Sequence, residues 1–428
     1  MKGKLRFQTF YVFGDLFMKR VFVLFVLLLV AVFFFFEFFN MSKEKEEPQI
    51  TTANITTQTT EEIKETKIYA VWLTYSEIGS FVKNKTESEY KETLETVFGN
   101  LKDNKINTVF YQCRAFCDSF YKSDIFPVSK YITANSNSPA FDPFEIFLEK
   151  AEKYNISVHC WINPYRISYD AEFKNLPKNS PARELYKADE NTLIICEEGI
   201  FLNPATDEAR ALVLSGIREI LEKYQVAGIH FDDYFYPETK EINDDELYKE
   251  YKKQGGLLTI TDWRRENVNV LVSSVYSFVK AHNENMIFSI SPSADIEKCK
   301  NVFFCDVEKW CREEGFVDLI IPQIYYGFEN EEMPFGKVFK EWNDLCKNQD
   351  VKLLCGLGAY KCGREDKFAG KGKDEWNENV NILSTQYEQA LVSPVWQGFS
   401  LFSYSYCFGD NVTEISKKEI KNLLYMVE

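Results

Sequence analysis

The chain has 428 residues, a formal net charge of −15 and a pI near 5.0. A chain this acidic repels a phosphate backbone, so its charge argues against a nucleic-acid-binding protein. Apolar residues make up 45% of the chain and aromatic residues 16%, which supplies a large core; the aromatic excess either suits stacking on sugar rings or reflects a bias towards phenylalanine.

The first predicted element is a membrane span at 21–39, which reads VFVLFVLLLVAVFFFFEFF. Nineteen helical residues are about 28 Å long, close to the thickness of a bilayer core. Basic residues are frequent in 1–20, and the stretch SKEKEE follows the span. The positive-inside rule therefore predicts a cytoplasmic segment at 1–20, a transmembrane signal-anchor at 21–39 and an extracellular remainder at the cell surface. A cleaved signal peptide is the alternative.

Residues 40–66 follow the span and are rich in Thr, Glu and Lys, with almost no large apolar side chains. Such a segment cannot bury enough apolar surface to offset the entropy of ordering its backbone. We expect a disordered linker here.

Beyond residue 67 the chain alternates between short apolar runs and amphipathic segments. Eight runs have the length and composition of buried strands, at 68–75, 106–114, 156–164, 226–234, 286–293, 317–326, 351–360 and 398–406. Eight segments have helical periodicity, at 87–104, 142–154, 206–224, 261–284, 302–314, 335–348, 374–391 and 413–427. Apolar strands separated by amphipathic helices indicate parallel pairing with both faces of the sheet covered. The pattern predicts an α/β fold, a (β/α)8 TIM barrel over 67–428, with long loops at 165–200 and 235–260 on its carboxyl-end face.

Several enzyme chemistries lack their motifs in this sequence. No G-x-G-x-x-G follows a strand and no G-x-S-x-G occurs, so neither a dinucleotide site nor a serine hydrolase is expected. The three histidines are scattered and the eleven cysteines form no C-x-x-C pair, which argues against a zinc site. We expect no cofactor and no metal, and we interpret the cysteines mainly as packing residues.

The fourth predicted strand ends in two adjacent acids, in the stretch VAGIHFDDYFYP. His230 and Asp232 share a parity, so both should face the barrel interior, whereas Asp233 reaches the same cleft only if the chain turns at the strand end. Two carboxyls in one cleft raise each other's pKa, and glycoside cleavage uses one carboxylic acid together with one carboxylate. Asp232 and Asp233 are therefore the candidate catalytic residues. The alternatives are that Asp233 only caps the following turn, or that Asp295 supplies the second carboxyl.

Polar and aromatic side chains at the other strand exits suit a neutral, polyhydroxylated ligand. We expect His230 to orient its neighbours, and His159 to be either a core residue or a donor to a sugar hydroxyl. Arg114 and Arg166 either keep the aspartates ionised or support loops. The candidate binding residues are Gln112, Arg114, His159, Asn163, Arg166, His230, Tyr236, Gln323 and Tyr325.

These motifs together resemble a known family. The stretches NPYR, GIHFDDYFYP and PQIYY are its most specific features, supported by INTVFYQCRAFCD, FLNPATDEAR and ISISPSAD. Over 67–428 the chain is similar to the glycosyl-hydrolase-like 10 family of bacterial cell-surface proteins. The resemblance implies a TIM barrel with glycosidase activity and cell-wall glycan, such as peptidoglycan, as the substrate class.

The GIHFDD motif also resembles the G-x-R-x-D motif of the α-amylase superfamily, which implies a nucleophile-like role for Asp232. That superfamily carries a catalytic glutamate on its fifth strand, where this chain has SISPS. The identity of the acid therefore stays open. The sequence predicts a membrane-anchored glycoside hydrolase, with a catalytically inactive, glycan-binding surface barrel as the alternative.

Overall fold

The structure is a computed structural model that describes residues 67–133, 138–239, 242–346 and 350–427. The described residues form one compact unit within Glu65–Glu428. The predicted cytoplasmic segment, membrane span and linker at 1–20, 21–39 and 40–66 lie outside them. Among the described helices, none has both the length and the apolar character that crossing a membrane requires.

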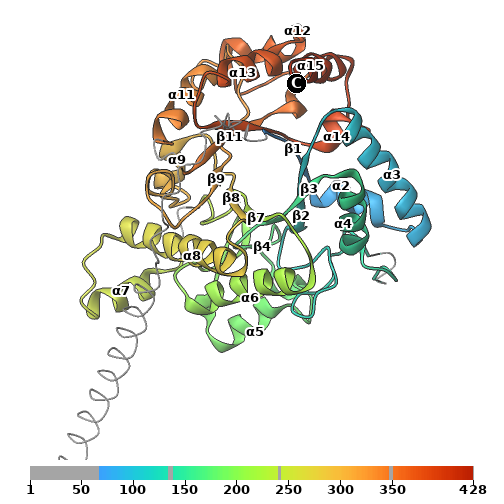
Figure 1. The fold of residues 1–428 in the computed structure, drawn as a ribbon. Helices are drawn as coiled ribbons and strands as arrows, with labels where there is room; N and C mark the ends of the chain where they lie inside the picture. The colour runs from blue at the N-terminus through green and yellow to red at the C-terminus, as the bar shows by residue number, and fades with distance from the viewer. Residues whose placement is uncertain (1–66, 134–137, 240–241, 347–349, 428) are drawn as a thin grey trace, which may run out of the picture. The chain divides into compact units, whose positions relative to one another are not determined.

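The predicted closed barrel of eight parallel strand positions is confirmed (Figure 1). The last strand pairs with the first, in the register Ile68↔Gly398, and this pairing closes the ring. One position consists of two short pieces, which are separated by Ile321 and Pro322. The strands around the ring are β1 (Ile68–Leu73), β2 (Thr108–Arg114), β3 (Ser157–Ile162), β7 (Gly228–Phe231), β8 (Ile287–Ile290), β9 (Leu319–Ile320) with β10 (Gln323–Ile324), β11 (Lys352–Leu357) and β12 (Trp396–Leu401).

Alternation along the strands sorts the apolar side chains into two separate cores. In β1, Val71 and Leu73 belong to the large core between the strands and the surrounding helices. Ala70 and Trp72 belong to a smaller cluster inside the ring. This two-residue period follows from strand geometry, in which successive side chains point to opposite faces.

Helices surround the ring (Figure 1), and local signals set their ends. The side chains of Thr86 and Glu89 form a capping box at the start of α3, and Asp142 caps α4 with Pro143 as its first residue. The helices are α2 (Tyr75–Val82), α3 (Glu87–Asp103), α4 (Pro143–Tyr154), α5 (Pro181–Ala188), α6 (Asp207–Lys223), α7 (Asp245–Lys253), α8 (Ile260–His282), α9 (Ile296–Asn301), α10 (Val307–Arg312), α11 (Phe335–Leu345), α12 (Glu375–Glu378), α13 (Ile382–Ala390), α14 (Tyr404–Cys407) and α15 (Glu414–Met426).

Two helical segments and one strand differ from the sequence prediction. The pattern predicts a single helix over 302–314, but α9 ends before Val302, and only α10 lies within that range. The segment 374–391 contains α12 and α13 with a break at 379–381. The last strand ends at Leu401, and the residues Tyr404–Cys407 form helix α14 instead.

The first long loop contains a small sheet that the sequence pattern did not predict. Strands β4 (Arg166–Ser168), β6 (Gly199–Leu202) and β5 (Leu193–Cys196) form a three-stranded antiparallel sheet. Arg166, the first residue of β4, pairs with Phe201 of β6. The small sheet therefore gives this arginine a fixed backbone position.

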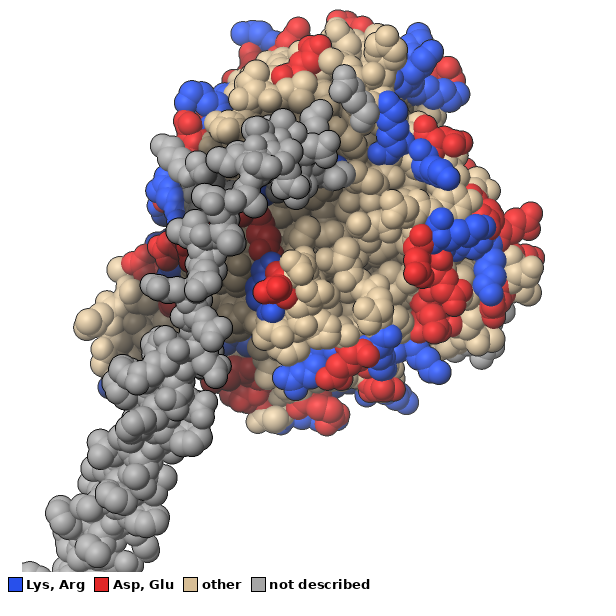
Figure 2. Space-filling view, in the orientation of Figure 1, with Lys and Arg blue, Asp and Glu red and all other residues tan. Residues whose placement is uncertain are grey.

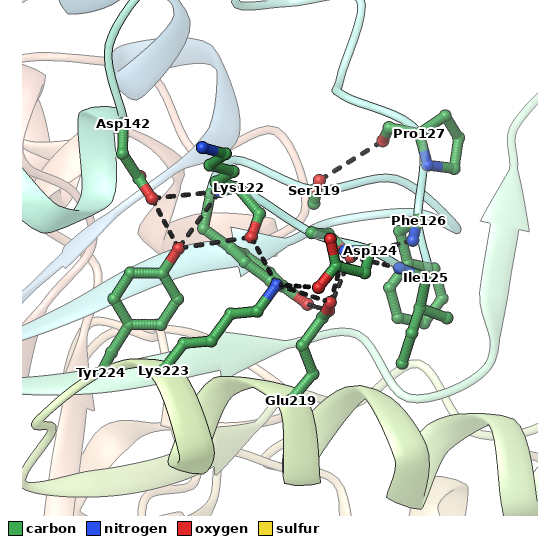
Figure 3. A network of polar contacts seen from close by, with 12 residues as sticks. Ser119, Lys122, Asp124, Ile125, Phe126, Pro127, Asp142, Glu219, Lys223 and Tyr224 are labelled. Atoms are coloured by element: carbon green, nitrogen blue, oxygen red, sulfur yellow. Dashed lines mark hydrogen bonds and ion pairs between the residues drawn. The ribbon is translucent and has the colours of Figure 1, made fainter.

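A polar network ties the loop after β2 to helix α6 (Figure 3). The Glu219 carboxylate accepts hydrogen bonds from the Ser123 hydroxyl at 2.6 Å and from the backbone N–H of Asp124, and Lys223 lies 3.1 Å from it. The Tyr224 hydroxyl donates to Asp142 at 2.6 Å. Burial opposes ionisation of Glu219, but these donors outweigh it and lower the pKa of Glu219.

Charged side chains lie mainly at the rim of the face shown in Figure 2, where acidic and basic groups alternate, while its middle is largely uncharged. The cysteines lie in the interior: all eleven are free thiols, and ten of them are buried. Buried free thiols pack as small apolar groups.

The close packing around β7 leads to a stability prediction for Gly228→Ala. A Cβ on Gly228 would lie 2.4 Å from the Ile287 carbonyl oxygen and 2.5 Å from His159 Nδ1. Because both neighbours are fixed in the barrel, we expect the variant to lose about 1–3 kcal/mol of unfolding free energy in urea titrations. Gly99→Ala in α3 is the matched control, since a Cβ at that position would meet no neighbouring group within 4 Å; it should be neutral or more stable by up to about 1 kcal/mol. Equal effects of the two substitutions would contradict this packing.

Candidate active site

A cavity of about 620 Å³ lies at the carboxyl ends of the barrel strands. The carboxyl ends of all eight parallel strand positions face one end of the ring, where barrel enzymes build their sites. Strands and their exits contribute polar groups to the wall, together with helix α2, the loop that contains the β4 sheet, helix α14 and the loop after α14. Its main lining residues are Tyr75, Glu77, Gln112, Trp161, Arg166, Tyr169, Asp232, Asp233, Tyr234, Gln323, Phe402, Ser403, Tyr406 and Asp410.

Asp232 directly follows β7 and lines the cavity, although only 3% of its surface is exposed. Its Oδ2 accepts a hydrogen bond from Trp161 Nε1 at 3.0 Å, and its Oδ1 accepts one from the backbone N–H of Tyr234 at 3.2 Å. Burial and then the charge of Asp233 raise the pKa of Asp232 to about 7, while Arg166 acts in the opposite direction. A carboxyl in this state exchanges protons near neutral pH.

Asp233 also lines the cavity and is less buried than Asp232. Burial raises the pKa of Asp233, and the Gln323 side chain and Arg166 partly offset that effect. The backbone carbonyl of Asp233 accepts a hydrogen bond from the Phe235 N–H at 3.0 Å, so the chain turns directly after β7. This turn brings the side chain of Asp233 to the same cavity as that of Asp232.

Arg166 enters the cavity wall from β4 and is 3% exposed. Its guanidinium carbon lies 3.6 Å from the ring centroid of Tyr234 and 4.3 Å from that of Tyr169. Nη1 donates to the Tyr169 hydroxyl at 2.7 Å. Aromatic rings therefore fix the plane of this cation.

His230 lies one inward position below Asp232 and is fully buried. Trp72 Nε1 lies 3.1 Å from His230 Nε2, and Ser289 Oγ lies 2.9 Å from Nδ1. An indole N–H only donates, so Nε2 must be the acceptor and Nδ1 must carry the proton. Burial, followed by His159, holds the pKa of His230 well below its ordinary value. His230 is thus a neutral ring beneath the aspartates, bonded on both nitrogens.

Three amide side chains lie in or directly behind the cavity wall. Gln112 lines the cavity; its Oε1 accepts from the Tyr75 backbone N–H at 2.8 Å, and its Nε2 donates to Asn163 Oδ1 at 2.9 Å. Asn163 is buried behind it, and its Nδ2 has no partner among the described residues. Gln323, from β10, lines the cavity and donates to the Ser291 carbonyl at 3.0 Å.

Besides Asn163 and His230, whose contacts are given above, four more of the sequence candidates lie outside the cavity lining. The Arg114 guanidinium carbon lies 4.6 Å from the Phe126 ring centroid, and a Cβ on Gly216 of α6 would clash with Arg114 Nη1. Arg114 therefore packs against the Phe126 side chain and helix α6. The Tyr236 ring packs edge-on against Phe304.

The other two face the barrel interior. His159 contacts the Phe110 ring edge-on, and burial lowers its pKa to about 4. Tyr325 packs edge-on against Trp72, next to Phe402 of the cavity wall. Neither arrangement presents these side chains to a ligand in the cavity.

The structure adds residues that the strand pattern did not select. Glu77 in α2 is 7% exposed, and its carboxylate accepts hydrogen bonds from the Ser403 hydroxyl at 2.7 Å and from the Thr74 backbone N–H at 2.7 Å. The spacing of Thr74 and Glu77 is that of a capping box, which is visible in the sequence but marks only a helix start. Asp295, the alternative source of a second carboxyl, accepts the Lys298 backbone N–H at 3.0 Å as the cap of α9.

The charged groups of the cavity wall are carboxyls and one arginine, set among amides, hydroxyls and aromatic rings. Across the described part of the chain, no three His, Cys, Asp or Glu side chains gather as a metal-binding group. The carboxyls of this wall are groups that can exchange protons with a bound ligand.

Comparisons of the sequence with known proteins give a consistent picture. A family model described as Glycosyl hydrolase-like 10 matches residues 67–373. The chain is 30% identical over 299 residues to the protein named Glycosyl hydrolase YngK from Bacillus subtilis, covering 65% of this chain and 58% of that protein. It is 28% identical over 326 residues to Glycosyl hydrolase DigH from Escherichia coli K12, covering 70% and 72%. The match thus spans less than two thirds of the B. subtilis protein.

Solved structures share the fold at low sequence identity. The PgaB (BpsB) glycoside hydrolase domain from Bordetella bronchiseptica has a TM-score of 0.54 and 11% identity, covering 79% of this chain and 94% of that one. Alpha-L-fucosidase isoenzyme 2 from Paenibacillus thiaminolyticus has a TM-score of 0.53 and 11% identity, covering 85% and 49%. At these identities the likeness concerns the barrel fold alone.

The bond from Trp161 to Asp232 leads to a prediction for Trp161→Phe. The indole N–H favours the ionised carboxylate, so its loss should raise the pKa of Asp232 further. Carbon-13 NMR of labelled aspartate across a pH series measures this ionisation. Trp310→Phe is the control, because it removes an indole N–H that donates to Asn269 at 2.8 Å and that does not contact the cavity. An unchanged or lowered pKa in Trp161→Phe would contradict the assigned bond.

Proposed function

Because this chain belongs to the glycosyl hydrolase-like 10 family, we propose that it hydrolyses glycosidic bonds of a polysaccharide in the cavity above β7. The family and its named relatives support a glycosidase. The observation that carries the proposal is the pair of aspartates on one cavity wall, with the pKa of both raised by burial. Two coupled carboxyls share a proton near neutral pH, and glycoside cleavage needs one protonated and one ionised carboxyl.

We assign the anionic role to Asp232 and the acid role to Asp233. Both oxygens of Asp232 accept N–H donors, and such donors favour the ionised form. Asp233 is the more accessible of the two and is therefore the better placed to reach a leaving oxygen, although burial raises the pKa of both. In this scheme Asp233 protonates the leaving oxygen, while Asp232 acts as nucleophile or as the base that activates water.

The lining of the cavity supports a sugar as its ligand. The rings of Tyr75, Tyr169, Tyr234 and Tyr406 border it, and polar groups from several strands lie between them. A cavity of about 620 Å³ lies within the range of small-ligand sites. Cell-wall glycan is the substrate class that we propose.

Substitution of the aspartates tests this proposal. We expect wild-type protein to release reducing ends from at least one of several glycans, including peptidoglycan. Asp232→Asn and Asp233→Asn should each lower that rate by about 10²–10⁴-fold, because each removes a proton-transferring or charged group. The reducing-end assay measures this directly.

The matched control is Asp295→Asn, which changes the same functional group outside the cavity. Asparagine caps helices about as well as aspartate, so α9 should persist. Activity of Asp295→Asn within about two-fold of wild type is expected from this reasoning. A wild-type protein that binds glycan but cleaves none would instead identify a glycan-binding barrel.

We also propose that the barrel is extracellular and anchored by residues 21–39. The support is the apolar run with basic residues before it and acidic residues after it. In intact cells that express the protein, external protease should digest the barrel, and the protein should fractionate with membranes. Protection of the barrel in intact cells, with digestion only after lysis, would refute this location.

A further inference from the structure

Arg166 is a buried cation without an acidic partner. It is 3% exposed, and its Nε has no hydrogen-bond partner among the described residues. Its one side-chain hydrogen bond within that part of the chain goes to the neutral hydroxyl of Tyr169. Buried charges in proteins are normally paired, because removal from water costs several kcal/mol per ion. A partner for this guanidinium is therefore missing from the described protein.

The two nearby acids do not supply that partner. No carboxylate in the described residues lies within the 4.0 Å ion-pair distance of the guanidinium. Arg166 acts on Asp232 and Asp233 only through space, lowering the pKa of each. The oxygens of Asp232 instead accept bonds from Trp161 and Tyr234.

The surroundings of Arg166 favour a role in binding a ligand over a role in supporting the loop. Tyr234 and Tyr169 hold its plane and are themselves 37% and 53% exposed, so the stack lies at the cavity mouth. A planar guanidinium with free N–H groups matches the two oxygens of a carboxylate. In a cavity that also contains two aspartates, an anionic sugar would be repelled unless such a cation compensated.

We propose that Arg166 is a specificity residue that binds a carboxylate substituent on the sugar next to the cleaved bond. The proposal rests on the proposed function, since it concerns the same cavity. Free carboxylates in glycans come from two chemical sources, the lactyl ether of muramic acid and the C6 carboxyl of a uronic acid. Both present the same two oxygens to the guanidinium, and the test must separate them.

The experiment compares matched ligand pairs on the full-length protein. The first pair is peptide-free muramic-acid glycan strands, untreated or with their carboxyls converted to neutral methylamides. The second pair is a uronic-acid oligosaccharide and its methyl ester. For each ligand, binding is measured by calorimetry and hydrolysis by reducing-end release, on wild type and on Arg166→Gln and Arg166→Lys.

We expect wild type to bind and cleave the charged member of one pair better than its neutral form. Loss of one charge-assisted contact corresponds to about 10- to 100-fold, so Arg166→Gln should lose a preference of that size. Arg166→Lys should retain part of the preference, because lysine keeps the positive charge but lacks the paired N–H donors of the guanidinium. Arg218→Gln is the control for lost charge; this exposed arginine lies on α6 outside the cavity and should keep the preference.

The outcomes separate this inference from the proposed function. If wild type cleaves charged and neutral forms equally and Arg166→Gln slows both equally, the arginine only tunes the aspartates and the inference is wrong. If wild type prefers to bind one charged form yet cleaves neither, the proposed function fails while the inference stands. If no ligand of either pair is bound or cleaved, the inference is refuted, and the proposed function then depends on the reducing-end assay with the other glycans. The pair in which the preference appears identifies the source of the carboxylate.

Discussion

The alternation of side chains along β7 is the constraint on which the site depends. A period of two residues sends Gly228, His230 and Asp232 into the ring and Ile229 and Phe231 to the helix-facing core. The missing side chain of Gly228 leaves room for His159. His230 is held from both sides by Trp72 and Ser289. Asp232 therefore projects into the cavity from a floor with little freedom to move.

The two aspartates and Arg166 share the cavity wall without forming an ion pair. The carboxylate oxygens of Asp232 accept hydrogen bonds from uncharged N–H donors, and the guanidinium of Arg166 stacks against aromatic rings. Ion pairing would have fixed all of these groups in their charged states, whereas the observed arrangement lets the aspartates keep a proton near neutrality. A glycosidase site requires this property.

Sequence reasoning predicted the barrel and its eight strand positions because buried parallel strands and amphipathic helices have distinct periods. It also brought Gln112, Arg166, Asp232, Asp233 and Gln323 to one cavity, since the carboxyl ends of parallel strands meet. It did not separate Arg114, which points outward, from the rest, because the shift in β2–β3 register after Gln112 is not visible in composition. Glu77 lies in helix α2 after β1, and Tyr169 directly follows β4. At such positions tertiary contacts rather than periodicity decide where a side chain lies.

The ring is closed by the two ends of the barrel sequence. β1 pairs with β12, and Glu77 accepts the Ser403 hydroxyl and the Ser405 N–H, across more than 320 residues. A ribosome must thus synthesise almost the whole chain before the first strand finds its second neighbour. Until then β1 presents an unpaired edge, which is a template for association with other chains. Biogenesis of this barrel therefore has a vulnerable interval that ends only when its final strand is released.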